Sequence, residues 1–195
     1  ADAPDATPID IRGGRIVFDD VTFHYGGHAA PLYDGLSVDI RAGERVGRVG
    51  RSGSGKTTFV KLVQRLYDVS GGRILIDGRD VTKLPMYRRA RLGIGYLPQE
   101  ASIFRGLTVE ENILAVLETV EPDKAERQLQ LDALLEEFRI TRLRTSPAIR
   151  LSGGERRRVE IARSLASRPS FMLLDEPFAG IDPIAVNDIR ALVRH

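Results

Sequence analysis

The chain has 195 residues, 42% hydrophobic and 29% charged, which is typical of one globular domain with a sizeable core. Its 29 basic and 27 acidic residues nearly cancel, so the charge gives no reason to expect nucleic acid as a partner. The sequence has no cysteine, which excludes disulfides and thiolate metal sites, and no apolar run approaches the roughly 20 residues of a membrane-spanning helix.

The first part of the chain reads as a tail followed by strands. Residues 1–13 are rich in Pro, Asp and Ala and lack the pattern of a signal peptide, which favours a cytoplasmic protein. Residues 15–23 alternate between polar and apolar with one slip at Asp19-Asp20, and predict the first strand. Further strands are predicted at residues 36–40, 45–49, 73–76, 94–97 and 171–174, with turns at 42–44 and 77–78.

Helices are predicted between the strands and through most of the second half. Residues 56–66 place Phe59, Val60, Val63 and Leu66 on one face. Further helices are predicted at residues 109–117, 123–138, 154–166 and 184–193. Because strands and helices alternate, the pattern predicts an α/β fold in which residues of about 100–168 form a helical insert.

A phosphate-binding loop is predicted at residues 50–57, Gly-Arg-Ser-Gly-Ser-Gly-Lys-Thr, which fit the pattern G-x-x-x-x-G-K-[ST] for ATP or GTP. Gly53 and Gly55 permit a positive φ, and the following helix adds its positive end. Lys56 is expected to bridge the outer phosphates and Thr57 to give its hydroxyl to Mg²⁺. A glycine-rich turn that fits by chance is the alternative, expected about once in a hundred chains of this length.

Two acids end the apolar run at residues 171–174. Asp175 is costly there unless a cation meets it, which favours Mg²⁺ held through water. Glu176 points elsewhere and is the candidate general base for an attacking water. The alternative is that the strand simply ends in two solvated acids before a turn. The phosphate loop upstream disfavours this alternative, because it makes a nearby Mg²⁺ site expected.

Residues 151–155, Leu-Ser-Gly-Gly-Glu, allow two interpretations that are compatible. Ser152 followed three residues later by Glu155 is a capping box at the start of a helix. A helix start with a serine and two glycines is also a second anion site. Since the loop at 50–57 already holds a nucleotide in its own subunit, this second site would act in trans.

With these motifs in this order, the chain resembles the nucleotide-binding domain of ABC transporters from residue 14 onward. The resemblance implies an α/β fold, a P-loop NTPase (RecA-like) core with an N-terminal antiparallel β-subdomain and an inserted α-helical subdomain, truncated at its C-terminus. Residues 1–13 would be a linker and 14–195 a single ABC ATPase domain. Within it, 14–98 and 169–195 would form the core with the β-subdomain, and 99–168 the helical subdomain.

The resemblance also implies roles for single residues. Glu176 would be the catalytic base, and Asp182 would lie in the D-loop. Mg²⁺ would be held by Thr57, Gln99 and Asp175, and the signature residues that close in trans would be Ser152, Gly153 and Gly154. The nucleotide-binding residues, with Tyr25 stacked on adenine, would be Tyr25, Gly50, Ser52, Gly53, Ser54, Gly55, Lys56, Thr57 and Thr58.

The implied cofactors are ATP and Mg²⁺, and the implied partners are a second copy in a head-to-tail dimer and a separate transmembrane subunit at the cytoplasmic face of the inner membrane. Residues 14–80 resemble exporters with a fused ATPase, typically lipid exporters. Residues 93–105 and 151–183 are similar instead to the ATPase subunit of the lipopolysaccharide-export transporter. This division suggests a chimera joined near residues 80–90.

Two other functions remain open, a scaffold that binds ATP without hydrolysing it and a non-transport ABC ATPase of DNA repair or translation. The first is favoured because the family's switch histidine would lie beyond the last residue, and His195 reads as a solvated chain end.

Arginines give two further expectations. Arg48 is unusual in a strand that should be buried, so it should meet an acid or lie on an exposed face. Arg156, Arg157 and Arg158 read as the solvated face of a helix rather than as a lipid or nucleic-acid site.

Overall fold

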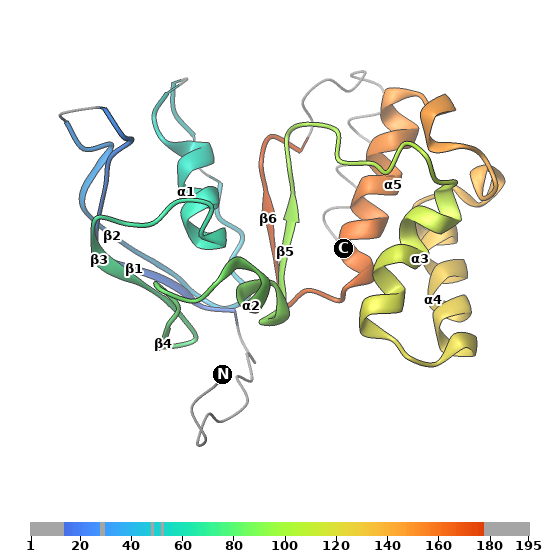
Figure 1. The fold of residues 1–195 in the computed structure, drawn as a ribbon, viewed down its shortest axis with the longest axis horizontal. Coiled ribbons are helices and arrows are strands. Elements are labelled where there is room, and N and C mark those ends of the chain that lie inside the picture. The colour runs from blue at the N-terminus through green and yellow to red at the C-terminus, as the bar shows by residue number, and fades with distance from the viewer. Residues whose placement is uncertain (1–13, 28–29, 48, 52, 178–195) are drawn as a thin grey trace. The chain divides into compact units, whose positions relative to one another are not determined.

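The computed structural model describes residues 14–27, 30–47, 49–51 and 53–177, and the chain divides into two compact units, residues 1–94 and 95–195 (Figure 1). The fold is α/β, with an antiparallel sheet in the first unit and mainly helices in the second. In the described part of the chain, no helix is both long enough and apolar enough to cross a bilayer.

The first unit is built on a four-stranded antiparallel sheet with the strand order β2-β1-β3-β4. Its strands are β1 Ile16–Phe23, β2 Tyr33–Ile40, β3 Gly71–Ile76 and β4 Arg79–Asp80. The expected slip in β1 is present, because the pairing register shifts between Phe18 and Val21 and Asp20 has φ 55°. Phe18 and Val21 are three positions apart, so in a regular strand they would lie on opposite faces. Because of the bulge, both side chains are buried. The turn between β3 and β4 has positive φ at Asp77 and Gly78, as a tight hairpin requires.

The helix α1, Lys56–Gln64, covers one face of this sheet. Phe59 stacks on Phe18 of β1 with ring centroids 4.2 Å apart, and Leu62 and Val63 are fully buried. The helix ends two residues earlier than predicted, because Arg65 turns into the left-handed conformation and its N–H bonds back to the Leu62 carbonyl. Leu66, expected on the buried face, is therefore 45% exposed.

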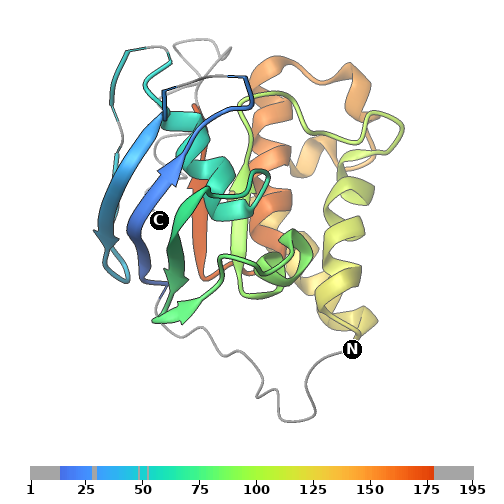
Figure 2. The same ribbon diagram turned by 60° about the vertical axis from the view of Figure 1, so that its left-hand side comes forward.

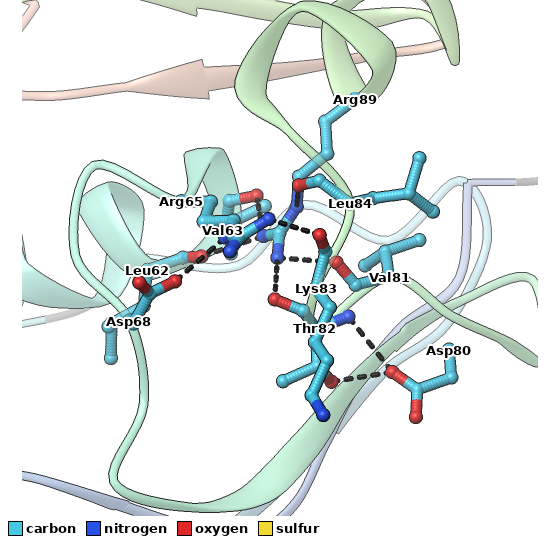
Figure 3. A network of polar contacts seen from close by, with 10 residues as sticks. All are labelled: Leu62, Val63, Arg65, Asp68, Asp80, Val81, Thr82, Lys83, Leu84 and Arg89. Atoms are coloured by element: carbon cyan, nitrogen blue, oxygen red, sulfur yellow. Dashed lines mark hydrogen bonds and ion pairs between the residues drawn. The ribbon is translucent and has the colours of Figure 1, made fainter. Parts of the chain in front are cut away.

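A short helix that the sequence did not predict, α2 Met86–Arg91, supplies a buried arginine to the end of α1. Arg89 is 1% exposed and makes five hydrogen bonds, all to backbone carbonyls, as Figure 3 shows. Nη1 donates to Leu62 and Val63 at 2.8 and 2.6 Å, so it satisfies carbonyls that a helix end leaves open. The other acceptors are the carbonyls of Val81, Thr82 and Leu84. Burial lowers the pKa of Arg89 to about 10, so the guanidinium stays charged at neutral pH.

The strand predicted at residues 45–49 is absent from the part of this segment that the structure describes. Val46 is 51% exposed and Val49 is 96% exposed, whereas a strand entering a sheet would bury them. The sequence offers a physical reason. Gly47 adds no side chain to a core, and an unpaired buried arginine at position 48 would cost several kcal/mol. Arg48 itself lies outside the described residues.

The second unit combines two short strands with helices; the strands and helices predicted between residues 94 and 174 are confirmed, with α3 ending three residues later than predicted. The strands are β5 Ile94–Leu97 and β6 Phe171–Leu174; the helices are α3 Val109–Val120, α4 Lys124–Glu137, the 3-10 turns η1 Thr141–Leu143 and η2 Ala148–Arg150, and α5 Gly153–Ala166. The core joins Leu97 of β5 to fully buried side chains of three helices, among them Ile113, Leu131 and Val159. Leu131 and Leu135 lie four positions apart, on the same face of α4, and both are fully buried, so this face packs against the core.

The strands β5 and β6 pair as a two-stranded sheet and lie side by side in both views (Figures 1 and 2). They approach so closely at Gly95 that a Cβ there would overlap Met172 Sδ and lie 2.9 Å from side-chain carbons of Pro169. At the other end, the Asp175 N–H donates to the Leu97 carbonyl. Since the two strands meet at their starts and at their ends, they run parallel, and the segments that follow them emerge at one edge.

Candidate functional site

The phosphate loop leads directly into α1, and its glycines have the expected backbone conformation. Gly55 is the N-cap with φ 85° and ψ 7°, and Gly53 has φ 83°. Gly55 has no side chain that could cap this helix, and the amides at a helix start are groups that bind anions. Among the loop residues described, Arg51, Gly53 and Ser54 are exposed, which gives an anion access. Ser52, also expected in the loop, lies outside the described residues.

Lys56 folds back over the loop that precedes it. Its Nζ donates to the carbonyls of Gly50 at 2.8 Å and Arg51 at 3.1 Å. The ammonium group is therefore held close to the loop, where it is available to a bound phosphate. A Cβ at Gly50 would come within 2.5 Å of Ser54 Oγ, so a larger residue there would have to displace the Ser54 side chain.

The back of the loop contacts a tyrosine that the sequence interpretation missed. Tyr33 of β2 is buried, and its Oη donates to the Gly55 carbonyl at 2.5 Å. A Cβ at position 55 would lie 2.7 Å from this oxygen, so Gly55 is required by space as well as by its φ. The sequence pattern missed this tyrosine because the strand was predicted only at residues 36–40, whereas β2 begins three residues earlier, at Tyr33.

Tyr25, the expected adenine contact, lies beside the start of α1. Its Oη and Thr58 Oγ1 are 2.8 Å apart, so two of the expected nucleotide residues are in contact. The Tyr25 ring packs edge-on against Phe23 at 5.0 Å and Tyr67 at 5.3 Å between centroids. Tyr67, which the sequence analysis did not single out, is thus a second aromatic ring next to the position expected for the base.

In the second unit, the ends of β5 and β6 bring two more expected residues together. Gln99 Nε2 donates to Glu176 Oε2 at 2.9 Å. Asp175, 6% exposed at the end of β6, is buried as expected of a carboxylate that meets a cation. The described residues hold no cluster of three or more His, Cys, Asp or Glu that could enclose a metal alone, and an Mg²⁺ that shares its ligands with phosphates needs no such cluster.

Arg157 binds the backbone that follows β5 and β6, and the prediction that it lies on a solvated face is wrong. The side chain is 5% exposed, with Nη1 donating to the Pro98 carbonyl at 2.8 Å and Nε to the Pro177 carbonyl at 2.9 Å. Its Nη1 also meets Glu160 Oε2 at 3.1 Å. The physical reason is that buried carbonyls after β5 and β6 require donors, and a guanidinium supplies several in one plane. Its neighbours Arg156 and Arg158 are only partly exposed.

The signature segment begins α5 with the capping box predicted from the sequence. Glu155 N–H donates to Ser152 Oγ at 3.3 Å, and Ser152 N–H donates to Glu155 Oε2 at 3.1 Å. The Ser152 backbone N–H, and after it the Ser152 hydroxyl, lower the pKa of Glu155. Ser152 and Gly153 are exposed, which leaves them accessible to a second molecule, and Gly154 is partly exposed.

The expected site residues therefore fall into groups that the structure describes separately. The loop, Lys56, Thr57, Tyr25 and Thr58 belong to the first unit, whereas the second unit holds Gln99, Asp175, Glu176 and the signature residues. Asp182 of the expected D-loop, the helix at 184–193 and His195 lie outside the described residues.

Comparison with known proteins decides the family. A family model described as "ABC transporter" matches residues 33–179. The chain belongs to the ABC transporter family. A probable ABC transporter ATP-binding protein of Azorhizobium caulinodans is 62% identical over 191 residues, 98% of this chain and 67% of that protein. The lipopolysaccharide export system ATP-binding protein LptB of Escherichia coli K12 is 52% identical over 165 residues, 84% of this chain and 68% of LptB. The chain spans about two thirds of the length of these ABC relatives.

Solved structures of ABC proteins share the fold. A bacterial Atm1-family ABC exporter with ATP bound matches with a TM-score of 0.81 and 32% identity, over the whole of this chain and 35% of that one. CbiO1 of Clostridium perfringens, part of the ABC transporter complex cbiONQ, has a TM-score of 0.82 at 26% identity and covers 93% of this chain and 73% of its own.

The same comparison corrects the expectation of a chimera. The A. caulinodans relative aligns with 191 of the 195 residues, through both segments that were thought to come from different sources. Since one ABC protein carries both segments, their different resemblances do not indicate a junction near residues 80–90.

Proposed function

We propose that this chain is the ATP-binding and ATP-hydrolysing part of an ABC transporter, and that it energises the export of lipid or lipopolysaccharide through a separate transmembrane partner. The arrangement at the start of α1 carries the proposal. A helix whose N-cap is Gly55 follows a glycine loop, and the Lys56 ammonium lies over that loop. These are the groups that a triphosphate requires.

The division of roles follows from the chemistry of each side chain. Lys56 neutralises the outer phosphates, while Tyr25 and Thr58 lie where the base and its adjoining phosphate would bind. Glu176 accepts the proton of the attacking water, and Gln99 holds its carboxylate through the 2.9 Å hydrogen bond. Thr57, Gln99 and Asp175 would hold Mg²⁺, which adds positive charge at the phosphates when bound. Catalysis is then mainly positioning and charge neutralisation.

The remaining parts of the site come from a second copy. Ser152, Gly153 and Gly154 would close over the γ-phosphate bound by the other copy in a head-to-tail dimer, with Asp182 near the same interface. The exposure of Ser152 and Gly153 at the start of α5 supports this arrangement. The membrane partner would hold the domain at the cytoplasmic face of the inner membrane, and the LptB relatives at 52–53% identity support a lipopolysaccharide cargo.

Two measurements on the same material test the proposal. Calorimetric titration with Mg-ATP should show one nucleotide bound per chain, and a steady-state phosphate-release assay should show turnover. Binding without turnover would favour the hydrolysis-impaired scaffold. Folded protein that binds no Mg-ATP would overturn the proposed function altogether.

A further inference from the structure

The buried hydroxyl of Tyr33 acts on the phosphate loop through one peptide group. Tyr33 Oη donates to the Gly55 carbonyl at 2.5 Å, and the same carbonyl accepts the Phe59 N–H at 2.9 Å as the first bond of α1. Both acceptor positions of this oxygen are thus filled. One bond comes from the helix itself and the other from a neighbouring strand, so the helix start is joined to the sheet at this oxygen.

The geometry of the peptide carries this contact to the ligand side of the loop. The group between Gly55 and Lys56 is planar and trans, so its N–H points opposite to its carbonyl. Since carbonyls of a helix point toward its end, the Lys56 N–H points out of the helix start. That amide is among the N–H groups that a helix start leaves unpaired and that bind anions. A group that holds the Gly55 carbonyl therefore also fixes the direction of the Lys56 amide.

Packing at Gly55 shows that the tyrosine contacts the loop directly. A Cβ at Gly55 would lie 2.7 Å from Tyr33 Oη, 3.0 Å from Cζ and 3.1 Å from Cε1, so the ring lies against the bare Cα. The contact is buried, and a hydrogen bond in a medium of low dielectric polarises the group that it holds. A donor on the carbonyl makes the opposite N–H a better donor in turn.

We propose that Tyr33 is a positioning residue for the phosphate loop, whose hydroxyl orients and polarises the Gly55–Lys56 peptide so that the Lys56 amide can bind a nucleotide phosphate. The inference rests on the proposed nucleotide binding and adds to it a residue outside the loop motif. Tyr33 does not touch the nucleotide; it acts through Gly55.

The test is Tyr33→Phe, which keeps the ring and removes only the donor. Mg-ATP and Mg-tripolyphosphate are titrated in parallel, because tripolyphosphate has the phosphates without the base. Loss of one hydrogen bond at the phosphates should raise both dissociation constants by about 3- to 10-fold and by the same factor. Tyr87→Phe is the matched control, since Tyr87 is exposed on α2 and its hydroxyl loss should change neither constant.

The outcomes separate this inference from the proposed function. If the unmodified chain binds both ligands and Tyr33→Phe binds them equally well, the positioning role is wrong and nucleotide binding stands. If the variant loses affinity for Mg-ATP alone, the hydroxyl acts on the base side and the inference is also wrong. If the unmodified chain binds neither ligand, both ideas fail. Thermal unfolding of each variant establishes that the titrated protein is folded.

A measurement on the unmodified chain covers the case in which Tyr33→Phe does not fold. The carbonyl carbon of Gly55 and the amide of Lys56 are followed by NMR while Mg-tripolyphosphate is added. The proposal expects both signals to shift together along the titration, because one peptide group joins them. A Lys56 amide that does not respond to the ligand would contradict it.

Discussion

Gln99 and Glu176 are 77 positions apart in the sequence, and their side chains meet at 2.9 Å where β5 and β6 end. The two proposed roles of Gln99 do not compete, because Nε2 donates to the glutamate and Oε1 stays available to a cation. The glutamate is thereby held near the edge from which Asp175 also projects.

Glu176→Gln should retain nucleotide and lose turnover. The amide keeps the size of the side chain but cannot take a proton, and a positioned base typically contributes about 10²- to 10⁴-fold to rate. Single-turnover hydrolysis and Mg-ATP titration measure the two quantities separately. Glu137→Gln at the exposed end of α4 is the control and should change neither. Equal loss of binding and hydrolysis in Glu176→Gln would contradict the assignment of a base.

Lys56→Ala should abolish nucleotide binding. The substitution removes the cation over the loop and its bonds to the Gly50 and Arg51 carbonyls, so the phosphates lose a charge-assisted partner. Calorimetry should detect no heat of Mg-ATP binding at concentrations that saturate the unmodified chain. Lys124→Ala, at the exposed start of α4, provides the comparison and should bind normally. Normal affinity in Lys56→Ala would remove the loop from the site.

Arg89→Gln should destabilise the first unit. The shorter amide cannot reach all five carbonyls, and buried carbonyls without donors cost about 1–3 kcal/mol each, so a loss on the order of 3 kcal/mol is expected. Urea unfolding, followed by a probe in each unit, measures the free energy of unfolding. Arg91→Gln lies in the same helix and is exposed, so it should stay within about 0.5 kcal/mol. Equal effects of the two substitutions would show that the network in Figure 3 adds no stability.

Leu131→Ala should destabilise the helical core, whereas Leu129→Ala should not. Leu131 is fully buried and Leu129 is 64% exposed, although both lie in α4. A buried Leu→Ala change costs about 2–5 kcal/mol through lost transfer energy and a cavity. An exposed one stays within about 0.5 kcal/mol apart from helix propensity. Denaturant unfolding of the two variants measures the difference, and similar values would mean that α4 presents another face to the core.

Acid should weaken the start of α3 through Glu111. The Thr108 backbone N–H, and then its hydroxyl, lower the pKa of Glu111 below its ordinary value. A carboxylate whose pKa is lower in the folded state stabilises it above the unfolded-state pKa and loses that contribution as pH falls through the folded-state pKa. Glu111→Gln should therefore show a smaller loss of unfolding free energy below about pH 4.5. Glu118→Gln, exposed on the same helix, serves as the control. Parallel pH curves for Glu111→Gln and the unmodified chain would refute the capping contribution.

Local patterns predicted much of this fold because local physics determines those elements. The capping box at Ser152 and Glu155 spans three residues, and the slip in β1 is visible as two adjacent aspartates. The patterns failed where long-range burial decides. Arg89 and Arg157 look like surface charges in the sequence, yet each binds backbone carbonyls that lie far away along the chain. No periodicity shows which carbonyls a fold leaves without donors.

The phosphate loop shows the same limit within a motif. Its glycines, Lys56 and the start of α1 follow from the motif, but the contact from Tyr33 comes from another strand, 22 positions before Gly55. The strand predicted at 45–49 failed for the opposite reason. Its place directly before the phosphate loop suggested a buried strand, while Gly47 and Arg48 supply too little apolar surface to favour burial.

Gly95 is a position at which a substitution could slow the proposed ATP hydrolysis without altering any polar group. Its bare Cα lets β5 approach Met172 and Pro169; Gln99 lies four residues after Gly95, and Glu176 lies four residues after Met172. A methyl group at position 95 would push β5 and β6 apart. It would thereby shift the Gln99 amide relative to the Glu176 carboxylate. A substitution at Gly95 would therefore be a route to a form that keeps nucleotide bound and hydrolyses it slowly, with Glu176 itself unchanged.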